Sequence, residues 1–228
     1  MITKNITSEL YTILLRGISV LFLCTGIILS SCGGGDDEEQ LPELPSGATA
    51  SDKFRAHKDT FLKYDSLSPI PKEMRKTFKG LTYYSYSDMY VVIANYEPSE
   101  KPDTVKMIAT GGELRTMLRV GKFTFSLGEG ESVYTLYGYK QAGDKSLSIL
   151  LPFKDKTTGN ETYSAGRYVE VEDTGDNEVQ IDFNTAYSPY CAYNSNFSCL
   201  LVPPQNVLTV AIKAGEKTYA ASHSAGGK

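Results

Sequence analysis

Two cysteines in the last third of the chain are the side chains best suited to chemistry. Cys191 and Cys199 are separated by seven residues. A zinc site needs about four ligands, and paired cysteines usually have two to four residues between them, so we expect no metal here. Four interpretations remain open for the pair: a disulfide, two packed thiols, a redox pair, or a nucleophilic thiol. The last would need a neighbouring group that lowers its pKa.

Histidine chemistry has little support. The chain holds only two histidines. His57 falls between Phe54 and Phe61, at the edge of the apolar face of an expected helix, and His223 lies in the C-terminal tail. Neither position suits a catalytic base, which disfavours Ser-His-Asp and Cys-His arrangements and histidine-bound zinc. We predict no cofactor.

Two long connections hold most of the remaining polar chemistry. Residues 153–167 and 184–206 interrupt the strand pattern and are rich in hydrogen-bonding and aromatic side chains. Loops longer than about 12 residues are often functional. If these two connections meet, they form a polar pocket lined by tyrosines. The predicted ligand-binding residues are Tyr163, Arg167, Asp182, Asn184, Tyr187, Tyr190 and Asn194.

Each of these residues also has a structural interpretation. Arg167 is either a fork for a ligand carboxylate or phosphate or the partner of a carboxylate or of loop carbonyls. Asp182 and Asn184 either contact a ligand or form turns with nearby backbone. The tyrosines either form a binding platform or are half-buried packing.

A mainly β framework must position these connections. After Gly80 apolar residues recur with a period of two, the spacing of half-buried strands. Turn residues separate the segments, and no alternation of strands and helices indicates a parallel sheet. We therefore predict an antiparallel barrel or sandwich of about ten short strands. They cover 81–86, 89–96, 104–109, 114–120, 123–127, 133–139, 146–151, 168–172, 179–183 and 207–212.

One or two helices are expected before the strands. Ser51 is a suitable N-cap, Asp52 suits the first turn, and Phe54 and Phe61 fall on one face. This helix should end near Asp65. A short second helix would begin at Pro71 and stop at Gly80.

The first 39 residues predict the location of the protein. A basic start leads into an uncharged run that ends in Leu29-Ser30-Ser31-Cys32, which is typical of a secretory signal and too short to span a bilayer. The ending resembles a bacterial lipobox, so we predict a signal peptide over 1–31, which also removes Cys24, and a lipid such as palmitate on Cys32. The acidic run 36–39 is either a solvated linker or a surface-export signal of Gram-negative lipoproteins.

This signal divides the chain into four parts. Residues 32–50 are acidic and rich in Pro, Ser and Gly, and predict a flexible tether. Residues 51–219 form a single β-rich domain, and 220–228 form a disordered tail. We predict a lipoprotein of the cell envelope, held on the outer membrane at its periplasmic side or at the cell surface.

Composition limits the class of partner. The net charge is −4 and no basic stripe is present, which argues against nucleic acid. Hydrophobic residues make up 41%, enough for a core, and the 16 tyrosines with no tryptophan favour pleated surfaces. The predicted partners are a membrane, through the lipid, and an unidentified small molecule.

A family resemblance covers roughly residues 51–215. It is carried by Leu151-Pro152-Phe153, by Gly166-Arg167-Tyr168, by the run from Asp182 to Asn194 and by Pro203-Pro204. These motifs resemble the domain-of-unknown-function family 1684. The resemblance implies no activity. Ser164 stands where the family pattern Tyr-Gly-x-Gly-Arg-Tyr has its first glycine.

Three classes of function remain open. The first is a lipoprotein that binds a small polar ligand, such as a glycan fragment, between the two connections. The second is an enzyme that uses carboxylates, tyrosines or a thiol without histidine, with Asp155 and Glu161 as its carboxylates. The third is a non-catalytic interaction module. We place ligand binding first because polar and aromatic groups are concentrated where no histidine base is present.

Overall fold

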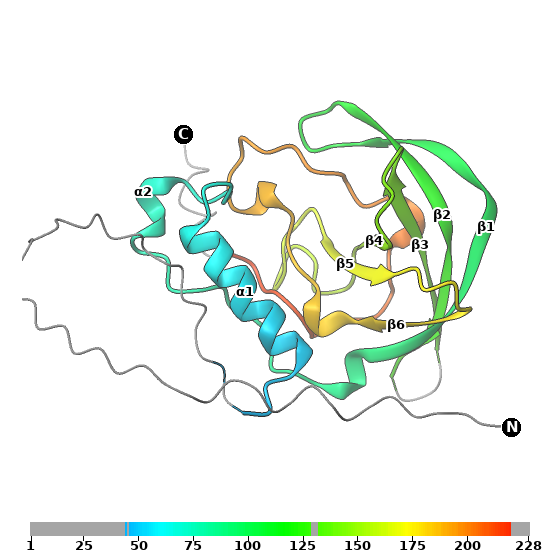
Figure 1. Cartoon of the computed structure of the whole chain (residues 1–228), viewed down its shortest axis with the longest axis horizontal. Coiled ribbons are helices and arrows are strands. Elements are labelled where there is room, and N and C mark those ends of the chain that lie inside the picture. Colours follow the sequence, from blue (N-terminus) through cyan, green and yellow to red (C-terminus); the bar gives the residue numbers. More distant parts are fainter. Residues whose placement is uncertain (1–43, 45, 129–131, 220–228) are drawn as a thin grey trace, which may run out of the picture. The chain divides into compact units, whose positions relative to one another are not determined.

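The computed structural model of the chain describes residues 44, 46–128 and 132–219 (Figure 1). The predicted signal peptide 1–31 and the lipidation residue Cys32 lie outside these residues, as do most of the tether 32–50 and the tail 220–228. Within the described ranges, no helix is both long and apolar enough to cross a membrane.

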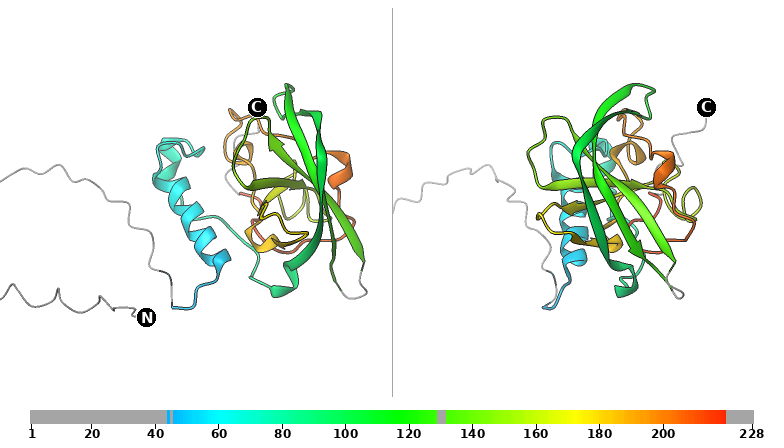
Figure 2. Two further views of the ribbon diagram at one scale, coloured as in Figure 1. Left: turned by 45° about the vertical axis from the view of Figure 1, so that its right-hand side comes forward. Right: turned by 90° about the vertical axis from the view of Figure 1, so that its right-hand side faces the viewer.

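One antiparallel sheet of six strands forms the framework and nearly closes into a barrel (Figures 1 and 2). Its strands lie in the order β5-β4-β3-β2-β1-β6. Their bounds are β1 Val91–Ile108, β2 Leu114–Ser126, β3 Val133–Gln141, β4 Ser148–Phe153, β5 Arg167–Glu172 and β6 Glu178–Asp182. The mainly β, antiparallel prediction is confirmed, but the prediction of about ten strands is wrong.

Four of the predicted strands are halves of two long ones. The expected strands 89–96 and 104–109 belong to β1, whose pairing with β2 shifts register between Pro98 and Asp103. The expected strands 114–120 and 123–127 form β2, which has an irregularity between Arg119 and Gly121. A bulge adds residues to one strand without ending the ladder. Turn residues inside a strand therefore looked like boundaries between strands.

The predicted strands 81–86 and 207–212 are not strands. The first forms one isolated bridge, Tyr83 to Glu216, and the second one bridge, Lys154 to Val207. Leu208 and Val210 of the second segment bond the backbone of residues 154–156, but the Ile212 N–H donates to the side-chain carboxylate of Asp155 at 2.6 Å. Backbone groups satisfied in this way do not propagate a ladder.

Helix α1 covers Ala50–Tyr64. Its N-cap is Thr49, which forms a capping box with Asp52. The predicted cap, Ser51, lies inside the helix and donates its hydroxyl to Asp182 at 2.6 Å. The helix ends at Asp65 as predicted, and a single turn, α2 Lys72–Arg75, follows Pro71.

Aromatic side chains fill the interior of the sheet. Along β2, Phe123 and Phe125 are buried while Lys122 and Thr124 are less so, which confirms the predicted alternation. Phe123 stacks on Tyr96 with ring centroids 4.4 Å apart. Figure 2 shows the long green strands that carry these rings.

Arg167 lies in this interior. Gly166, at a φ of +101° and with a Val202 methyl and the Phe153 carbonyl oxygen within 2.7 Å of where a Cβ would lie, turns the chain so that the next side chain points inward. The Arg167 guanidinium is fully buried. It donates to carbonyl oxygens of the C-terminal segment: Ile212 at 2.8 Å, Ala214, and Glu216 at 3.3 Å.

Arg167 also faces a buried carboxylate. Its Nη2 lies 3.6 Å from an Asp155 carboxylate oxygen, and neither side chain is exposed. The guanidinium thus ties the start of β5 to the segment 212–216, whose only β pairing among the described residues is the isolated bridge from Glu216 to Tyr83.

Replacing Arg167 with Ala should lower the free energy of unfolding by about 3–5 kcal/mol, because it leaves Asp155 as an unpaired buried charge and removes the donor from several buried carbonyl oxygens. Arg119→Ala is the control, since its pair with Asp103 is solvent-exposed and should matter by about 1 kcal/mol at most. Urea denaturation measures both. If both variants lower the free energy of unfolding by the same small amount, Arg167 does not hold the C-terminal segment in place.

Candidate functional site

One stripe of α1 ties the helix to the sheet through polar contacts. Ser51, Arg55, Lys58 and Leu62 follow at intervals of four, three and four residues, which is one face of a helix. Leu62 is fully buried. The three polar side chains donate, in order, to the carboxylate of Asp182 at 2.6 Å, the carbonyl of Asn184 at 3.2 Å and the carboxylate of Glu216 at 2.9 Å.

The Glu216 carboxylate is the centre of these contacts. It is fully buried and accepts hydrogen bonds from the Lys58 ammonium, from the Tyr193 hydroxyl at 2.7 and 2.8 Å, and from the Ser188 N–H at 3.1 Å. The first donor comes from α1 and the other two from the long connection 184–206. Burial lowers the pKa of Lys58, and the charge of Glu216 opposes that shift. One buried anion therefore joins the helix to this connection.

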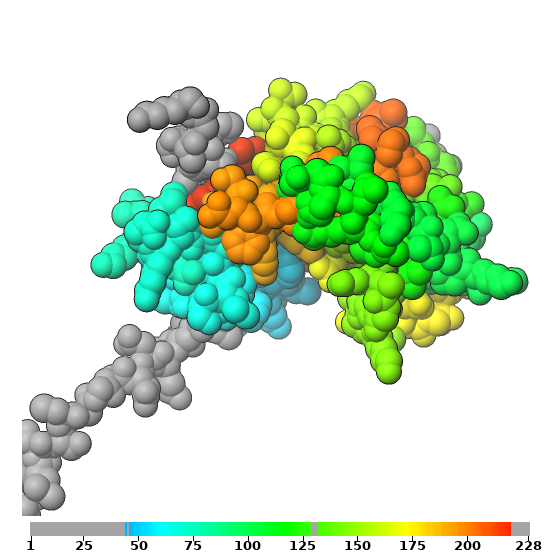
Figure 3. All heavy atoms as spheres, turned by 90° about the horizontal axis from the view of Figure 1, so that it is seen from above, coloured from blue at the N-terminus to red at the C-terminus, as the bar shows by residue number. Residues whose placement is uncertain are grey.

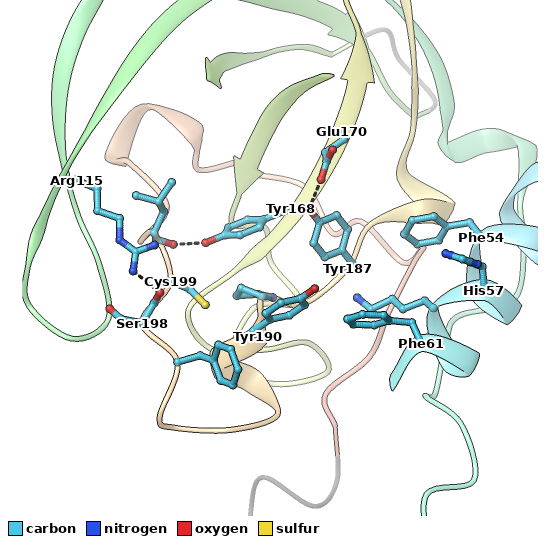
Figure 4. A pocket seen from close by; sticks show the side chains of 14 residues that line it. Phe54, His57, Phe61, Arg115, Tyr168, Glu170, Tyr187, Tyr190, Ser198 and Cys199 are labelled. Atoms are coloured by element: carbon cyan, nitrogen blue, oxygen red, sulfur yellow. Dashed lines mark hydrogen bonds between the residues drawn. The ribbon is translucent and has the colours of Figure 1, made fainter. Parts of the chain in front are cut away.

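A second stripe of α1 faces an open pocket. Phe54, His57 and Phe61 are spaced at i, i+3 and i+7, so they lie beside the anchoring stripe. Figure 4 shows them reaching toward Tyr187 and Tyr190. The Phe54 and Tyr187 rings are 6.2 Å apart, as are the Phe61 and Tyr190 rings.

The pocket has a volume of about 650 Å³. α1, β2, β5 and the segment 187–200 supply its lining, in which aromatic rings predominate (Figure 4). The lining residues are Phe54, His57, Lys58, Phe61, Arg115, Tyr168, Glu170, Tyr187, Pro189, Tyr190, Phe197, Ser198, Cys199 and Leu200. In Figure 3 the orange atoms of the segment that includes 190–200 lie between the cyan helical region and the green β1–β2 hairpin.

Polar groups sit on the wall opposite α1. Arg115, on β2, donates to the Ser198 carbonyl at 2.6 Å and to Glu113 at 2.8 Å. Among the described residues its Nη1 has no hydrogen-bond partner. The exposed carboxylate of Glu170 accepts from the Tyr187 hydroxyl and from Ser148 at 2.5 Å. Burial, together with the negative charge of Glu170, raises the pKa of Tyr187 well above its usual value and keeps it a donor.

A second hollow adjoins the first along this wall. It has a volume of about 820 Å³ and extends over β2, β3 and β4. It shares five lining residues with the pocket, so the two hollows are neighbours. The shared residues are Arg115, Tyr168, Glu170, Tyr187 and Leu200.

The structure brings only some of the predicted site residues to this pocket. Tyr187, Tyr190 and Cys199 line it. Cys191 and Cys199 are free thiols, both half-buried, and the Cys191 N–H donates to the Cys199 sulfur at 3.2 Å. The Tyr163 hydroxyl contacts the Cys191 sulfur at 3.6 Å. Of the predicted connections, 184–206 lines the pocket.

The other predicted residues make internal bonds. Arg167 lies in the interior, as described above. Asn184 is fully buried and bonds both backbone groups of Ser87, at 3.0 and 2.9 Å, while Asp182 accepts from Ser51 and from the Asn184 N–H. Asn194 donates to the Pro69 carbonyl at 3.0 Å.

The connection 153–167 does not contribute to the pocket lining. Its carboxylate at Asp155 accepts from the hydroxyls of Thr157 and Thr158 at 2.9 and 3.0 Å, and the Thr157 hydroxyl lies 3.0 Å from that of Thr162. The hydroxyls of these threonines are therefore satisfied within the segment, whereas Asp155 also accepts from the Ile212 N–H outside it. Glu161, the other predicted acid, is exposed at the surface, whereas Asp155 is buried.

Sequence reasoning missed the helix wall and the cationic side chains. The spacing of Phe54, His57 and Phe61 was a usable signal, but it equally fits a stripe packed on the core. No local pattern distinguishes Arg115 or Glu170 from other charged residues on strands. Within the described ranges, no group of three or more His, Cys, Asp or Glu side chains could hold a metal ion.

Comparisons with known proteins place the chain in a family. Residues 76–217 match the model of a protein family of unknown function (DUF1684). The solution NMR structure of an uncharacterised protein from Haloarcula marismortui is 39% identical, with a TM-score of 0.59, over 72% of this chain and 90% of that one. No curated protein matches. The chain therefore belongs to the DUF1684 family, as its motifs predicted.

Replacing Lys58 with Met should lower the free energy of unfolding by about 3–5 kcal/mol, because Glu216 would keep its burial without its cation. Adding Glu216→Gln in the same chain should recover most of that loss, because the carboxylate charge is then gone. A double-mutant cycle in urea measures the coupling. Additive losses would contradict a buried ion pair.

Proposed function

We propose that the pocket between α1 and the segment 187–200 binds a small polar ligand with an apolar ring face, a glycan fragment being the class that fits its chemistry. The observation that carries the proposal is the lining: aromatic rings on two facing walls with cations and a carboxylate at their edge. The volume of about 650 Å³ falls within the range of small-molecule sites, about 300–1,000 Å³.

The aromatic side chains support stacking of a ring. Tyr190 and Phe197 are 40% and 36% exposed and meet edge to face at 5.6 Å. Phe61 stacks on Tyr190 from the helix side, with ring centroids 6.2 Å apart. Flat rings with a polar edge bind ligands that have one apolar and one polar side, as the C–H face of a sugar ring does.

The polar groups support binding of hydroxyls and of an acidic substituent. The Nη1 of Arg115 and the exposed imidazole of His57 offer donors, and Glu170 offers acceptor lone pairs. Both cations already have a carboxylate partner, which is the buried Glu216 for Lys58 and the exposed Glu113 for Arg115. Arg115 is the more exposed cation, and its Nη1 is the donor that an anionic group would meet.

We also propose that the domain is a lipoprotein of the bacterial envelope, anchored through Cys32. The support is the sequence alone: a basic start, an uncharged run and the ending Leu29-Ser30-Ser31-Cys32. An anchor and a tether of residues 32–50 would hold the pocket near the outer membrane, where glycan fragments are present.

Screening by saturation-transfer NMR should find a binder in a panel of neutral, N-acetylated and uronic-acid mono- and disaccharides. For the best binder, Tyr190→Ala should weaken binding about tenfold, which corresponds to a loss of roughly 1.4 kcal/mol, because a stacking face is removed. Isothermal titration calorimetry measures the change.

The matched control is Tyr86→Ala. Tyr86 is 37% exposed, a fraction close to the 40% of Tyr190. Its hydroxyl donates to Asp88 outside the pocket, so binding should stay unchanged. Glycan binding at this pocket is refuted if no saccharide of the panel binds at millimolar concentration, or if Tyr190→Ala and Tyr86→Ala weaken binding equally.

Replacing Cys32 with Ser should abolish incorporation of a palmitate analogue in a Gram-negative host and release the protein from the membrane fraction, because the serine cannot accept the lipid. Cys191→Ser, in the same assay, should retain label and membrane association. Label that persists in the Cys32 variant would contradict the anchor.

A further inference from the structure

Two free thiols lie together beside the proposed binding pocket. The backbone N–H of Cys191 donates to the Cys199 sulfur at 3.2 Å. Both side chains are half-buried, and Cys199 lines the pocket. In Figure 4 the Cys199 sulfur is drawn between the wall of Arg115 and Tyr190.

The two cysteines are held in place without a covalent bond. Cys199 is fixed to the β1–β2 hairpin, because its N–H donates to the Thr110 hydroxyl at 3.0 Å and its carbonyl accepts from the Thr110 N–H at 2.8 Å. Cys191 lies in a 3₁₀ turn, Tyr190–Ala192, that follows Pro189. The site is therefore built in the reduced state.

The surroundings favour one thiolate. The Cys199 thiol donates toward the Cys191 sulfur and the Tyr163 hydroxyl does so at 3.6 Å, so the pKa of Cys191 falls to about 6, although burial opposes the shift. The pKa of Cys199 is raised, because its proton is held by its partner and because it is half-buried. Burial and the neighbouring sulfur raise the pKa of Tyr163, which stays a donor.

We propose that Cys191 and Cys199 form a thiol–disulfide exchange site, in which Cys191 attacks a disulfide and Cys199 resolves the product. The co-reactant is a small disulfide of the glutathione class. This inference concerns the sulfurs alone and does not depend on ligand binding in the pocket.

The exchange balances in two steps. The Cys191 thiolate attacks one sulfur of the small disulfide, a mixed disulfide forms, and one thiolate leaves. Cys199 then attacks the Cys191 sulfur, its proton passes to the second leaving thiolate, and an internal disulfide remains. The protein is oxidised by two electrons, and the small disulfide is reduced to one thiol and one thiolate, which takes its proton from water.

The structure also favours the reverse reaction. Forming the internal disulfide removes the thiolate that Tyr163 and Cys199 stabilise, so part of the stability of the reduced site is lost. A stabilised reduced form makes a disulfide more readily reducible. A purely structural disulfide would instead resist reduction by glutathione.

Site-resolved alkylation of the reduced full chain tests the first step. Iodoacetamide labelling of the Cys191 peptide, followed by mass spectrometry across pH 4.5–9, should show a midpoint near pH 6. Tyr163→Phe should move the midpoint to higher pH, because one donor to the thiolate is lost. A midpoint above pH 8 in the unmodified chain overturns the proposal.

Exchange with glutathione tests the second step. Oxidised glutathione should give a Cys191–Cys199 disulfide that millimolar reduced glutathione reopens. Cys199→Ser should stop at a stable glutathione adduct on Cys191, with circular dichroism confirming the fold. Absence of the internal disulfide, or a disulfide that resists reduced glutathione, overturns the proposal, whereas failure of the saccharide screen leaves it unaffected.

Discussion

A single buried carboxylate, that of Glu216, determines how the helix α1 meets the rest of the domain. It accepts from an ammonium on α1 and from two groups of the connection 184–206, with no solvent access. An anion buried in this way is costly without its donors. Helix α1, the connection 184–206 and the C-terminal segment that holds Glu216 must therefore come together around it. The backbone of the same residue accepts from Arg167 and bridges to Tyr83, which ties the arrangement to β5.

The pocket is a consequence of this constraint. Because Lys58 fixes the rotation of α1, the adjacent stripe of Phe54, His57 and Phe61 faces the segment 187–200 and not the sheet interior. The helix thus contributes few groups to the main core and most of its aromatic surface to the pocket. Its tyrosine partners are positioned by the same carboxylate, through Tyr193 and Ser188. Helix and connection are two walls of one site.

Period and turn chemistry sufficed to predict a mainly β, antiparallel domain and the C-terminal limit of α1. They failed where tertiary contacts replace local ones. Bulges near Pro98 and Gly121 looked like strand ends, and the carboxylate of Asp155 took a backbone donor that a seventh strand would have used. Arg167 and Asn184 look the same in sequence whether they bind a ligand or the backbone, and only burial separates the two. That α1 forms a wall of the pocket depends on the contact between Lys58 and Glu216, which are 158 residues apart in the sequence, so no local pattern predicts it.

Hydrogen–deuterium exchange of the unmodified chain and of Glu216→Gln tests this constraint most directly. We expect the amides of α1 and of residues 187–194 to lose protection together in the variant, because both depend on the same carboxylate, while the amides of β1–β3 keep theirs. Protection of α1 that is unchanged in the variant, or lost without any change at 187–194, would contradict the account.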